Sequence, residues 1–221
     1  MQRFFDIFFS LVALILLSPL LIFIVFILGI SGEREILFKQ NRIGKNGKIF
    51  KLIKFSTMLK DSPNIGTKTI TIKDDPRILP FGKILRKTKI NELPQLVNIL
   101  KGDMSLIGPR PLSEETFNFY DNRTKKYIKK MKPGLSGIGS IIFRSEEEML
   151  SKKNLKSKHF LKLMKYKGSL EEWYYYNQSI KIYFLLIVIT ILVVIIPYKI
   201  NLNLFFKNLP LPQKDISHLF Y

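Results

Sequence analysis

Two loops of the sequence carry residue types that bind phosphate groups. In the first loop, residues 106–111, Arg110 stands between two prolines, which hold its backbone extended and leave the guanidinium little freedom to lose. Such a guanidinium can donate paired hydrogen bonds to a phosphate, although an ordinary proline turn with a solvated arginine has the same sequence. In the second loop, residues 132–139, glycines could bring backbone N–H groups to an anion. The second loop lacks the spacing of a dinucleotide-binding loop and is a weak signal alone.

Charge and composition favour anionic partners and exclude several kinds of site. The 221 residues include 36 Lys and Arg against 17 Asp and Glu, which gives a net charge of +19. This charge attracts nucleic acid, anionic lipid and phosphorylated small molecules alike. The absence of cysteine excludes disulfides and thiolate zinc sites, and the two histidines, His159 and His218, are too far apart to indicate a histidine-built metal site. An oxygen-ligated magnesium site stays open.

An uncharged stretch, residues 7–30, is long enough as a helix to cross a bilayer core. Ser18 and Pro19 at its centre predict a kink, because proline removes an amide donor and clashes with the carbonyl four residues earlier. Two topologies follow. The helix either spans the membrane with a kink or re-enters the face from which it came, with the Ser18 hydroxyl bonding a freed carbonyl. The sequence pattern alone favours the span.

The rest of the chain predicts a small α/β domain. The segments 36–40, 42–47 and 48–55 read as two strands around an Asn46-Gly47 turn, which predicts a β-hairpin. Apolar spacing over residues 91–100 predicts a helix that Asn91 caps and that ends before Gly102. The polar residues 60–76 predict a mobile loop.

A second apolar stretch lies near the end of the sequence. Residues 182–198 are at the lower length limit for a membrane span, so a span, a shallow interfacial helix and a buried core helix all stay open. Residues 200–221 are uninformative.

The order of these segments resembles that of the bacterial sugar transferases, also called monotopic phosphoglycosyl transferases. The similarity is carried by the apolar segment centred on Ser-Pro, then FKQNRIGKNGKIFKLIKFSTM (38–58), DPRILPFGKILRKTKINELPQLVNILKGDMSLIGPRP (75–111) and KPGLSG (132–137). In that family the Ser-Pro helix is re-entrant, so the resemblance reverses the preference for a span. It implies a re-entrant membrane helix over 1–30, with Ser18 and Pro19 as the membrane break. A cytoplasmic catalytic-type domain would follow over 31–180, with a β-hairpin and surface amphipathic helices, then a membrane-associated helix over 181–199 and a tail.

The resemblance also implies a reaction. Family members move a sugar 1-phosphate from a nucleotide-diphosphate sugar, here expected to be a UDP-sugar, to polyprenol (undecaprenyl) phosphate, with Mg²⁺, and so initiate glycoconjugate or polysaccharide assembly. The implied location is the cytoplasmic face of the bacterial inner membrane. The family's Asp-Glu pair corresponds to Asn91-Glu92, with Glu92 as magnesium ligand. For such a reaction, Arg86 and Arg110 are expected to supply forked hydrogen-bond donors to phosphate, and Lys54, a matched family position, is expected to contact phosphate as well.

Asn91 is the most consequential departure from the family pattern. The family's aspartate is thought to attack phosphorus, and a neutral amide offers no comparable lone pair. Three accounts follow: an enzyme altered at its nucleophile, a non-catalytic binding or assembly relative, or direct attack by Glu92 or the lipid phosphate. Smaller departures are Lys89, Ser56 and Gly139-Ser140.

A different class of function is a basic membrane-bound protein that recruits anionic lipid or nucleic acid. This alternative leaves residues 91–111 unexplained, so we expect no nucleic-acid partner. The sugar, the nucleotide and self-association as a homodimer are not fixed by the sequence.

Overall fold

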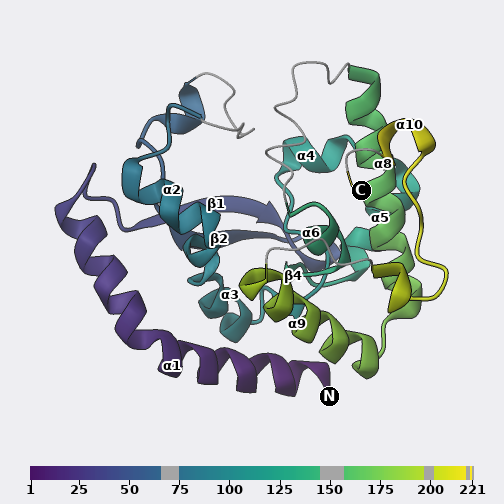
Figure 1. Cartoon of the computed structure of the whole chain (residues 1–221), viewed down its shortest axis with the longest axis horizontal. Helices are drawn as coiled ribbons and strands as arrows, with labels where there is room; N and C mark the ends of the chain where they lie inside the picture. Colours follow the sequence, from purple (N-terminus) through teal and green to yellow (C-terminus); the bar gives the residue numbers. More distant parts are fainter. Residues whose placement is uncertain (66–74, 145–156, 197–201, 218–219, 221) are drawn as a thin grey trace.

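The computed structural model describes residues 1–65, 75–144, 157–196, 202–217 and 220, and its fold is mixed α/β (Figure 1). A two-stranded antiparallel hairpin and a short parallel strand pair are surrounded by helices, as the sequence predicts for an α/β domain. The principal elements are α1 (Gln2–Ile30), β1 (Leu37–Ile43), β2 (Ile49–Phe55), α2 (Pro80–Lys87), α3 (Gln95–Lys101), β3 (Ser105–Ile107), α4 (Glu114–Asn118), α5 (Asn122–Lys130), β4 (Gly134–Ser136), α6 (Ile138–Ile142), α8 (Ser157–Asn177), α9 (Ile180–Ile195) and α10 (Lys214–Ser217).

The predicted hairpin is confirmed. Strands β1 and β2 pair so that Ile43 lies opposite Ile49. Asn46 and Gly47 between them both have positive φ, 58° and 76°, the backbone conformation that an Asn-Gly turn supplies at low cost. Phe50 on the inner face of the hairpin joins a buried cluster with residues of α3, and this packing fixes the hairpin on the domain.

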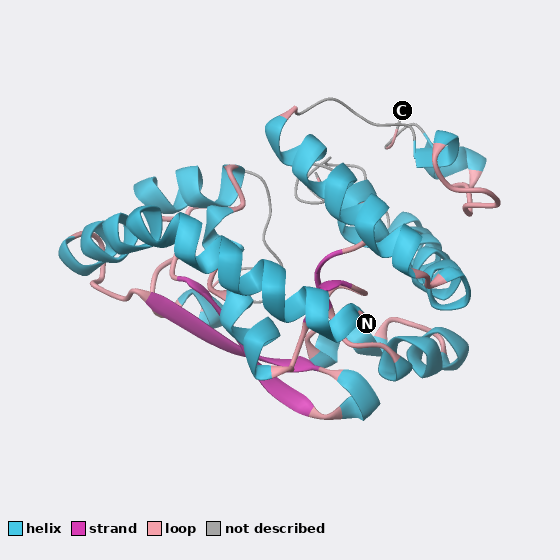
Figure 2. Ribbon diagram, turned by 90° about the horizontal axis from the view of Figure 1, so that it is seen from below, coloured by secondary structure: helices cyan, strands magenta, loops and turns pink. Residues whose placement is uncertain are grey.

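Helix α1 is long, apolar and largely uncovered. It is the one helix, within the described ranges, that is long and apolar enough to cross a membrane, and only 11% of its most apolar window is buried. The ribbon of α1 bends along its length in Figure 1, and Figure 2 shows the helix passing across the underside of the molecule. The helix contains Pro19, and the Ser18 hydroxyl donates to the Ile15 carbonyl at 2.8 Å. This is the carbonyl that proline leaves without its helical donor, so the predicted use of the Ser18 hydroxyl is confirmed.

The beginning of α1 is fixed to the domain by polar contacts. Arg3 donates to the carbonyls of Ile99 and Leu100 at the end of α3, where unpaired carbonyls and the helix dipole favour a cation. The buried Asp6 carboxylate accepts three hydrogen bonds of 2.9 Å each. Their donors are the Ser105 hydroxyl, the Leu106 backbone N–H and the Tyr183 hydroxyl.

Helix α3 begins later than predicted. It starts at Gln95, directly after Pro94, and ends at Gly102, whose φ of 93° is the left-handed conformation expected there. Asn91 is not a helix cap. It lies in a separate short 3-10 helix, Ile90–Glu92, and its side chain is buried. Proline fits the first turn of a helix but offers no N–H to the residues before it, which explains the break between the two helices.

The two loops singled out in the sequence lie side by side. Strands β3 and β4 are parallel, with Ser105 opposite Gly134, and Gly108 donates to the Ser136 carbonyl at 2.9 Å. The Gly134 N–H donates to the Pro109 carbonyl at 2.8 Å, so the hypothesis that this glycine amide faces an anion is wrong. A Cβ on Gly108 would lie 2.3 Å from the Lys132 carbonyl oxygen. The glycines therefore let the two loops approach closely, which brings the Arg110 loop against the second loop.

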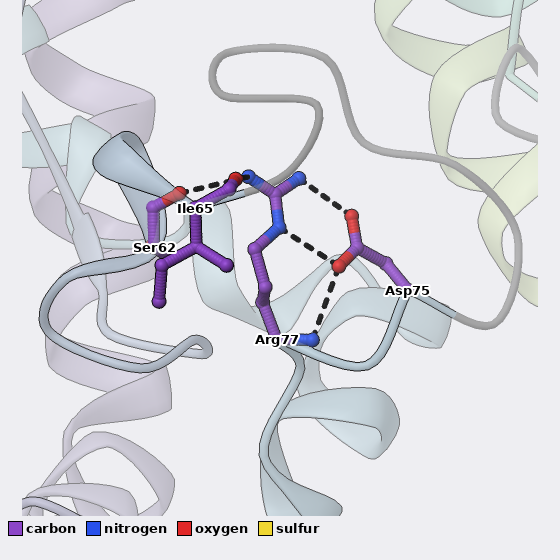
Figure 3. A network of polar contacts seen from close by, with 4 residues as sticks. All are labelled: Ser62, Ile65, Asp75 and Arg77. Carbon is purple, nitrogen blue, oxygen red and sulfur yellow. Dashed lines mark hydrogen bonds and ion pairs between the residues drawn. The ribbon is translucent and has the colours of Figure 1, made fainter.

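Arg77 ties together residues on either side of positions 66–74 (Figure 3). Its guanidinium forms two hydrogen bonds with the buried Asp75 carboxylate, at 2.6 and 2.8 Å, and donates to the carbonyls of Ser62 and Ile65. Most of the predicted mobile loop over 60–76 lies outside the described residues.

Helix α9 packs one face on the core and leaves the other uncovered. Tyr183, Leu186, Ile189 and Val193 are buried, whereas Val188, Ile191 and Ile195 are exposed. One side of α9 thus has the character of a core helix. The prediction that residues 181–199 associate with membrane concerns the exposed side of α9. Residues 197–199, the last of this predicted segment, are not among those described.

The tail is a packed element, contrary to its uninformative sequence. Leu202, Phe206, Leu209 and Ile216 belong to the same buried cluster as α8 and α9. Trp173 of α8 donates from Nε1 to the Lys207 carbonyl at 3.2 Å, which fixes the tail against that helix.

Candidate functional site

The inner face of the hairpin carries two cations. Lys54 lies opposite Phe38, and Arg42 lies opposite Phe50. Facing residues of an antiparallel pair lie on the same side of the sheet, and alternate residues of a strand share that side, so Arg42 and Lys54 lie on the face that buries Phe50 and Leu52. The ammonium of Lys54 is 5.1 Å from the centre of the Phe38 ring.

The charges around Lys54 show which residues the fold brings together. Burial is the main cause that lowers the pKa of Lys54 from 10.5 to about 8. The positive charges of Arg42, Arg86 and Arg110 contribute to this lowering, and the negative charge of Glu92 opposes it. Charge effects of this kind act over short distances in a screened medium. The fold therefore gathers Lys54, Arg86, Glu92 and Arg110, all of them singled out in the sequence, from β2, α2, the short 3-10 helix and the loop after β3.

Arg42 belongs to the same group and was missed in the sequence. Burial, and to a lesser extent the charge of Arg110, lower the pKa of Arg42 to about 10, while the charge of Glu92 opposes this change. Its Nη2 donates to Gln40 Oε1 at 2.6 Å, whereas its buried Nε has no hydrogen-bond partner among the described residues. The alternation Phe38, Gln40, Arg42 was the available signal, because it puts Arg42 on the face of Lys54.

Asn91 is the residue directly before Glu92, and its side-chain oxygen accepts no hydrogen bond from the described residues. Its side chain is 5% exposed, and its buried Oδ1 has no hydrogen-bond partner within the part of the chain that the structure describes. The turn before it is unusual, because Lys89 has a positive φ of 61°. A buried polar atom without a partner costs about 1–3 kcal/mol, so it indicates either a ligand contact or strain kept for function.

Glu171 of α8 is a second residue that sequence reasoning missed. It is fully buried, and burial raises its pKa to about 7, although the charge of Lys167 and a hydrogen bond from the backbone N–H of Arg110 oppose this rise. A Cβ on Gly139 would lie 2.4 Å from Glu171 Oε1, so a glycine at 139 leaves room for the carboxylate. Glu171 thus fixes the backbone of Arg110, whose guanidinium belongs to the group of charges that act on Lys54. No sequence pattern marked it, since burial of a single acid in a polar helix is not readable from spacing.

The side-chain oxygen atoms of Asn91 and Glu92 suit a magnesium ion that binds together with a phosphate ligand. The described residues include no cluster of three or more His, Asp or Glu side chains. Glu92 offers a carboxylate, and its neighbour Asn91 offers a buried amide oxygen that has no hydrogen-bond partner among the described residues. Mg²⁺ commonly takes one or two protein oxygens and completes its shell with water and substrate phosphate. Four nearby cations disfavour a lone divalent ion, whereas a bound diphosphate would neutralise them.

Among the residues that act on the pKa values of Lys54 and Arg42, the positive charges outnumber the negative ones. Arg42, Lys54, Arg86 and Arg110 act together with the carboxylate of Glu92, and the side chains of Arg42 and Lys54 are largely buried. Such an arrangement stabilises a polyanion and the negative charge that moves between oxygens in phosphoryl transfer. Arginine forks fix the orientation of phosphate oxygens, and lysine contributes a point charge.

Comparisons with known proteins show which family the chain resembles. The model of the family described as "Bacterial sugar transferase" matches residues 1–197. The "Exopolysaccharide production protein ExoY" of Sinorhizobium fredii is 35% identical over 159 residues, which are 66% of this chain and 70% of that protein. The "Undecaprenyl-phosphate galactose phosphotransferase" of Salmonella typhimurium is 35% identical over 160 residues, 66% of this chain and 33% of that protein.

A third relative has a more detailed name. It is the "UDP-N-acetylgalactosamine-undecaprenyl-phosphate N-acetylgalactosaminephosphotransferase" of Aeromonas hydrophila, 35% identical over 143 residues, 64% of this chain and 34% of that protein.

Proposed function

The chain belongs to the bacterial sugar transferase family, and we propose that it is a phosphoglycosyl transferase that acts on a UDP-sugar and undecaprenyl phosphate. The reaction moves sugar 1-phosphate from the nucleotide to the lipid phosphate and begins the assembly of a polysaccharide or glycoconjugate. The names of the Salmonella and Aeromonas relatives support this choice of donor and acceptor.

The gathering of Lys54, Arg86 and Arg110 with Glu92 carries the proposal. A diphosphate donor and a phosphorylated lipid repel each other, so a site that joins them needs cations to neutralise both. Lys54 and the two guanidinium groups bind and orient the phosphates, and the buried surroundings strengthen these interactions by excluding water. The sequence alone does not explain why residues of β2, α2, the short 3-10 helix and the loop after β3 act on one another's charges.

Glu92 is the proposed magnesium ligand, with the Asn91 amide oxygen beside it. Glu92 and Asn91 would hold the ion, which would supply Lewis-acid stabilisation of negative charge on phosphate oxygens. The role of the protein is then to hold the phosphates between Glu92 and the arginines in one orientation.

Asn91 limits turnover in this proposal. Family members are expected to use aspartate at this position to attack phosphorus, and the amide of Asn91 has no anionic oxygen for that step. Binding of both substrates does not depend on the nucleophile. The second candidate function is therefore a non-catalytic relative that binds the same ligands and assembles with an active enzyme, and Asn91 is the observation that favours it.

We place the domain on the cytoplasmic leaflet, with α1 re-entrant. The first residues of α1, Arg3 and Asp6, bond to the domain, and Glu33 and Glu35, just beyond its other end, bond to Lys60 of the same domain. A helix of 29 residues is about 43 Å long, and its two ends cannot lie on opposite sides of a bilayer while both contact one domain. The uncovered apolar side chains along α1 include Phe4, Phe8, Ile15, Leu16, Ile22, Phe23 and Phe26.

Ligand-induced thermal stabilisation tests the proposal. The full chain in lipid nanodiscs is melted with UDP-galactose or UDP-N-acetylgalactosamine plus Mg²⁺, and separately with duplex DNA. A ligand at a hundred times its Kd stabilises by about 2.7 kcal/mol, so we expect a clear rise in Tm with at least one UDP-sugar and none with DNA. Arg110→Gln should reduce the response. A salt-sensitive affinity for DNA together with no response to UDP-sugars would replace the enzyme proposal with the nucleic-acid alternative.

A further inference from the structure

The inner face of the hairpin contains a guanidinium that the implied active-site residues do not include. Arg42 lies on the side of β1 that faces the core, the same face of the hairpin that carries Lys54 of β2. The outer side of the same strand carries Lys39, which is exposed. A cation on an inward strand position is uncommon, because it must leave water, whereas a lysine on the outward position is ordinary.

One nitrogen of the Arg42 guanidinium has a hydrogen-bond partner, and another has none among the described residues. Nη2 of Arg42 donates to Gln40 Oε1 at 2.6 Å, which fixes the orientation of the planar group. Nε is buried and has no hydrogen-bond partner in the described ranges. An unused buried donor costs stability, and arginine offers Nε–H together with an adjacent Nη–H as a fork that matches two oxygens of a phosphate.

The charges near Arg42 favour an anion. No ion pair between described residues includes Arg42. Arg110 and burial both lower its pKa, and only Glu92 raises it. A largely buried guanidinium beside another positive charge is stabilised when an anion binds to it.

We propose that Arg42 binds phosphate oxygens of the ligand through its Nε–H edge, as a fourth cation of the site formed with Lys54, Arg86 and Arg110. This inference deepens the proposed function and rests on it. The phosphate comes from one of two sources, the diphosphate of the UDP-sugar or the phosphate monoester of the lipid.

Binding measurements on the full chain in nanodiscs separate the two sources. One arm titrates UDP-galactose with Mg²⁺, and the other compares nanodiscs with and without undecaprenyl phosphate. The variants are Arg42→Gln, which removes the charge, and Arg42→Lys, which keeps the charge but lacks the fork. Lys39→Gln is the matched control, because it removes one positive charge from the outer side of the same strand.

Arg42→Gln is expected to raise the Kd of at least one ligand about tenfold or more, and Arg42→Lys to raise the same Kd by a smaller factor. Lys39→Gln should change each Kd less than about twofold. In the absence of ligand, the Tm of Arg42→Gln should not fall, because the variant removes a buried cation that repels Arg110.

Several results would overturn the inference. Unchanged binding of both ligands by Arg42→Gln, or an equal loss in Lys39→Gln, would show that the Nε–H edge has no specific role. A large loss of ligand-free Tm, or failure to fold, in both Arg42 variants would make Arg42 structural. Wild-type protein that binds neither ligand would overturn the proposed function together with this inference, whereas normal wild-type binding that Arg42→Gln retains would overturn the inference alone.

Discussion

Glu171 accepts a hydrogen bond from the backbone N–H of Arg110, and this contact joins helix α8 to the charged loop. Its pKa is raised from an ordinary value of 4.5 to about 7, mainly because the carboxyl is buried. The protonated form is therefore favoured in the folded state. Its contribution to stability is complete below pH 4.5 and is lost as the pH rises through about 7.

Glu171→Gln should remove this pH dependence. We expect the free energy of unfolding of the wild type, relative to the variant, to fall by roughly 3 kcal/mol between pH 4.5 and 8, which urea titration at several pH values measures. Glu172→Gln is the neighbouring control, because Glu172 lies at the surface in an ion pair with Arg123. A constant difference between wild type and Glu171→Gln across this range would show that the carboxyl does not titrate there.

Asn91→Asp should restore the nucleophile that the family uses. We expect transfer of labelled sugar phosphate from a UDP-sugar to undecaprenyl phosphate to rise by several orders of magnitude above the wild-type rate. The double variant Asn91→Asp/Glu92→Gln should lose most of this gain, because the magnesium ligand is gone. Transfer that stays at background in the Asn91→Asp protein, with binding intact, would favour the non-catalytic role.

Gly108→Ala should separate the two loops. The new Cβ would lie 2.3 Å from the Lys132 carbonyl oxygen and 2.9 Å from the Gly134 nitrogen, both of them backbone atoms. Overpacking of this kind costs about 1–3 kcal/mol, and we expect a matching loss in the free energy of unfolding together with weaker UDP-sugar binding. Gly29→Ala in α1 is the control, since its nearest neighbour would be 4.0 Å away. Equal stabilities of the two variants would contradict the close approach.

Tyr183→Phe should weaken the attachment of α1. The Tyr183 hydroxyl is one of three donors to the buried Asp6 carboxylate, and a hydrogen bond to a charged group contributes about 1.5–3 kcal/mol. Asp6→Ala should cost more, because it leaves the Ser105 and Tyr183 hydroxyls without their acceptor. A double-mutant cycle between Asp6 and Tyr183 measures the coupling, and Tyr176→Phe, at an exposed tyrosine, is the control. Additive effects of the two substitutions would show that the bond contributes nothing.

Local signals predicted part of this architecture. The Asn46-Gly47 turn fixed the hairpin because both residues adopt positive φ readily, and Ser18 beside Pro19 indicated which carbonyl would need a donor. The start of α3 was misplaced, because an asparagine before a proline fits a cap as well as a separate turn. The packing of the tail could not be predicted, since its apolar residues follow no regular period that would show that they fold back on the two preceding helices.

The candidate site was likewise only partly predictable from the sequence. Lys54, Arg86, Glu92 and Arg110 were found through the resemblance to a family, and the fold brings them together. Arg42 and Glu171 were missed because their importance comes from burial and from contacts across long stretches of sequence. Strand alternation marked Arg42, whereas nothing in the local sequence distinguished Glu171 from the half-buried Glu172 beside it.

The contact between Trp173 and the tail has a practical use. Trp173 is the sole tryptophan of the chain, and its indole lies against Phe206 with ring centres 5.5 Å apart. The family match stops at residue 197, before this segment, so shortening the protein there would lay bare part of the hydrophobic interior. The intrinsic fluorescence of Trp173 therefore reports on this contact without an added label. A red shift and quenching of the Trp173 emission on loss of the segment would show that the tail no longer packs against α8.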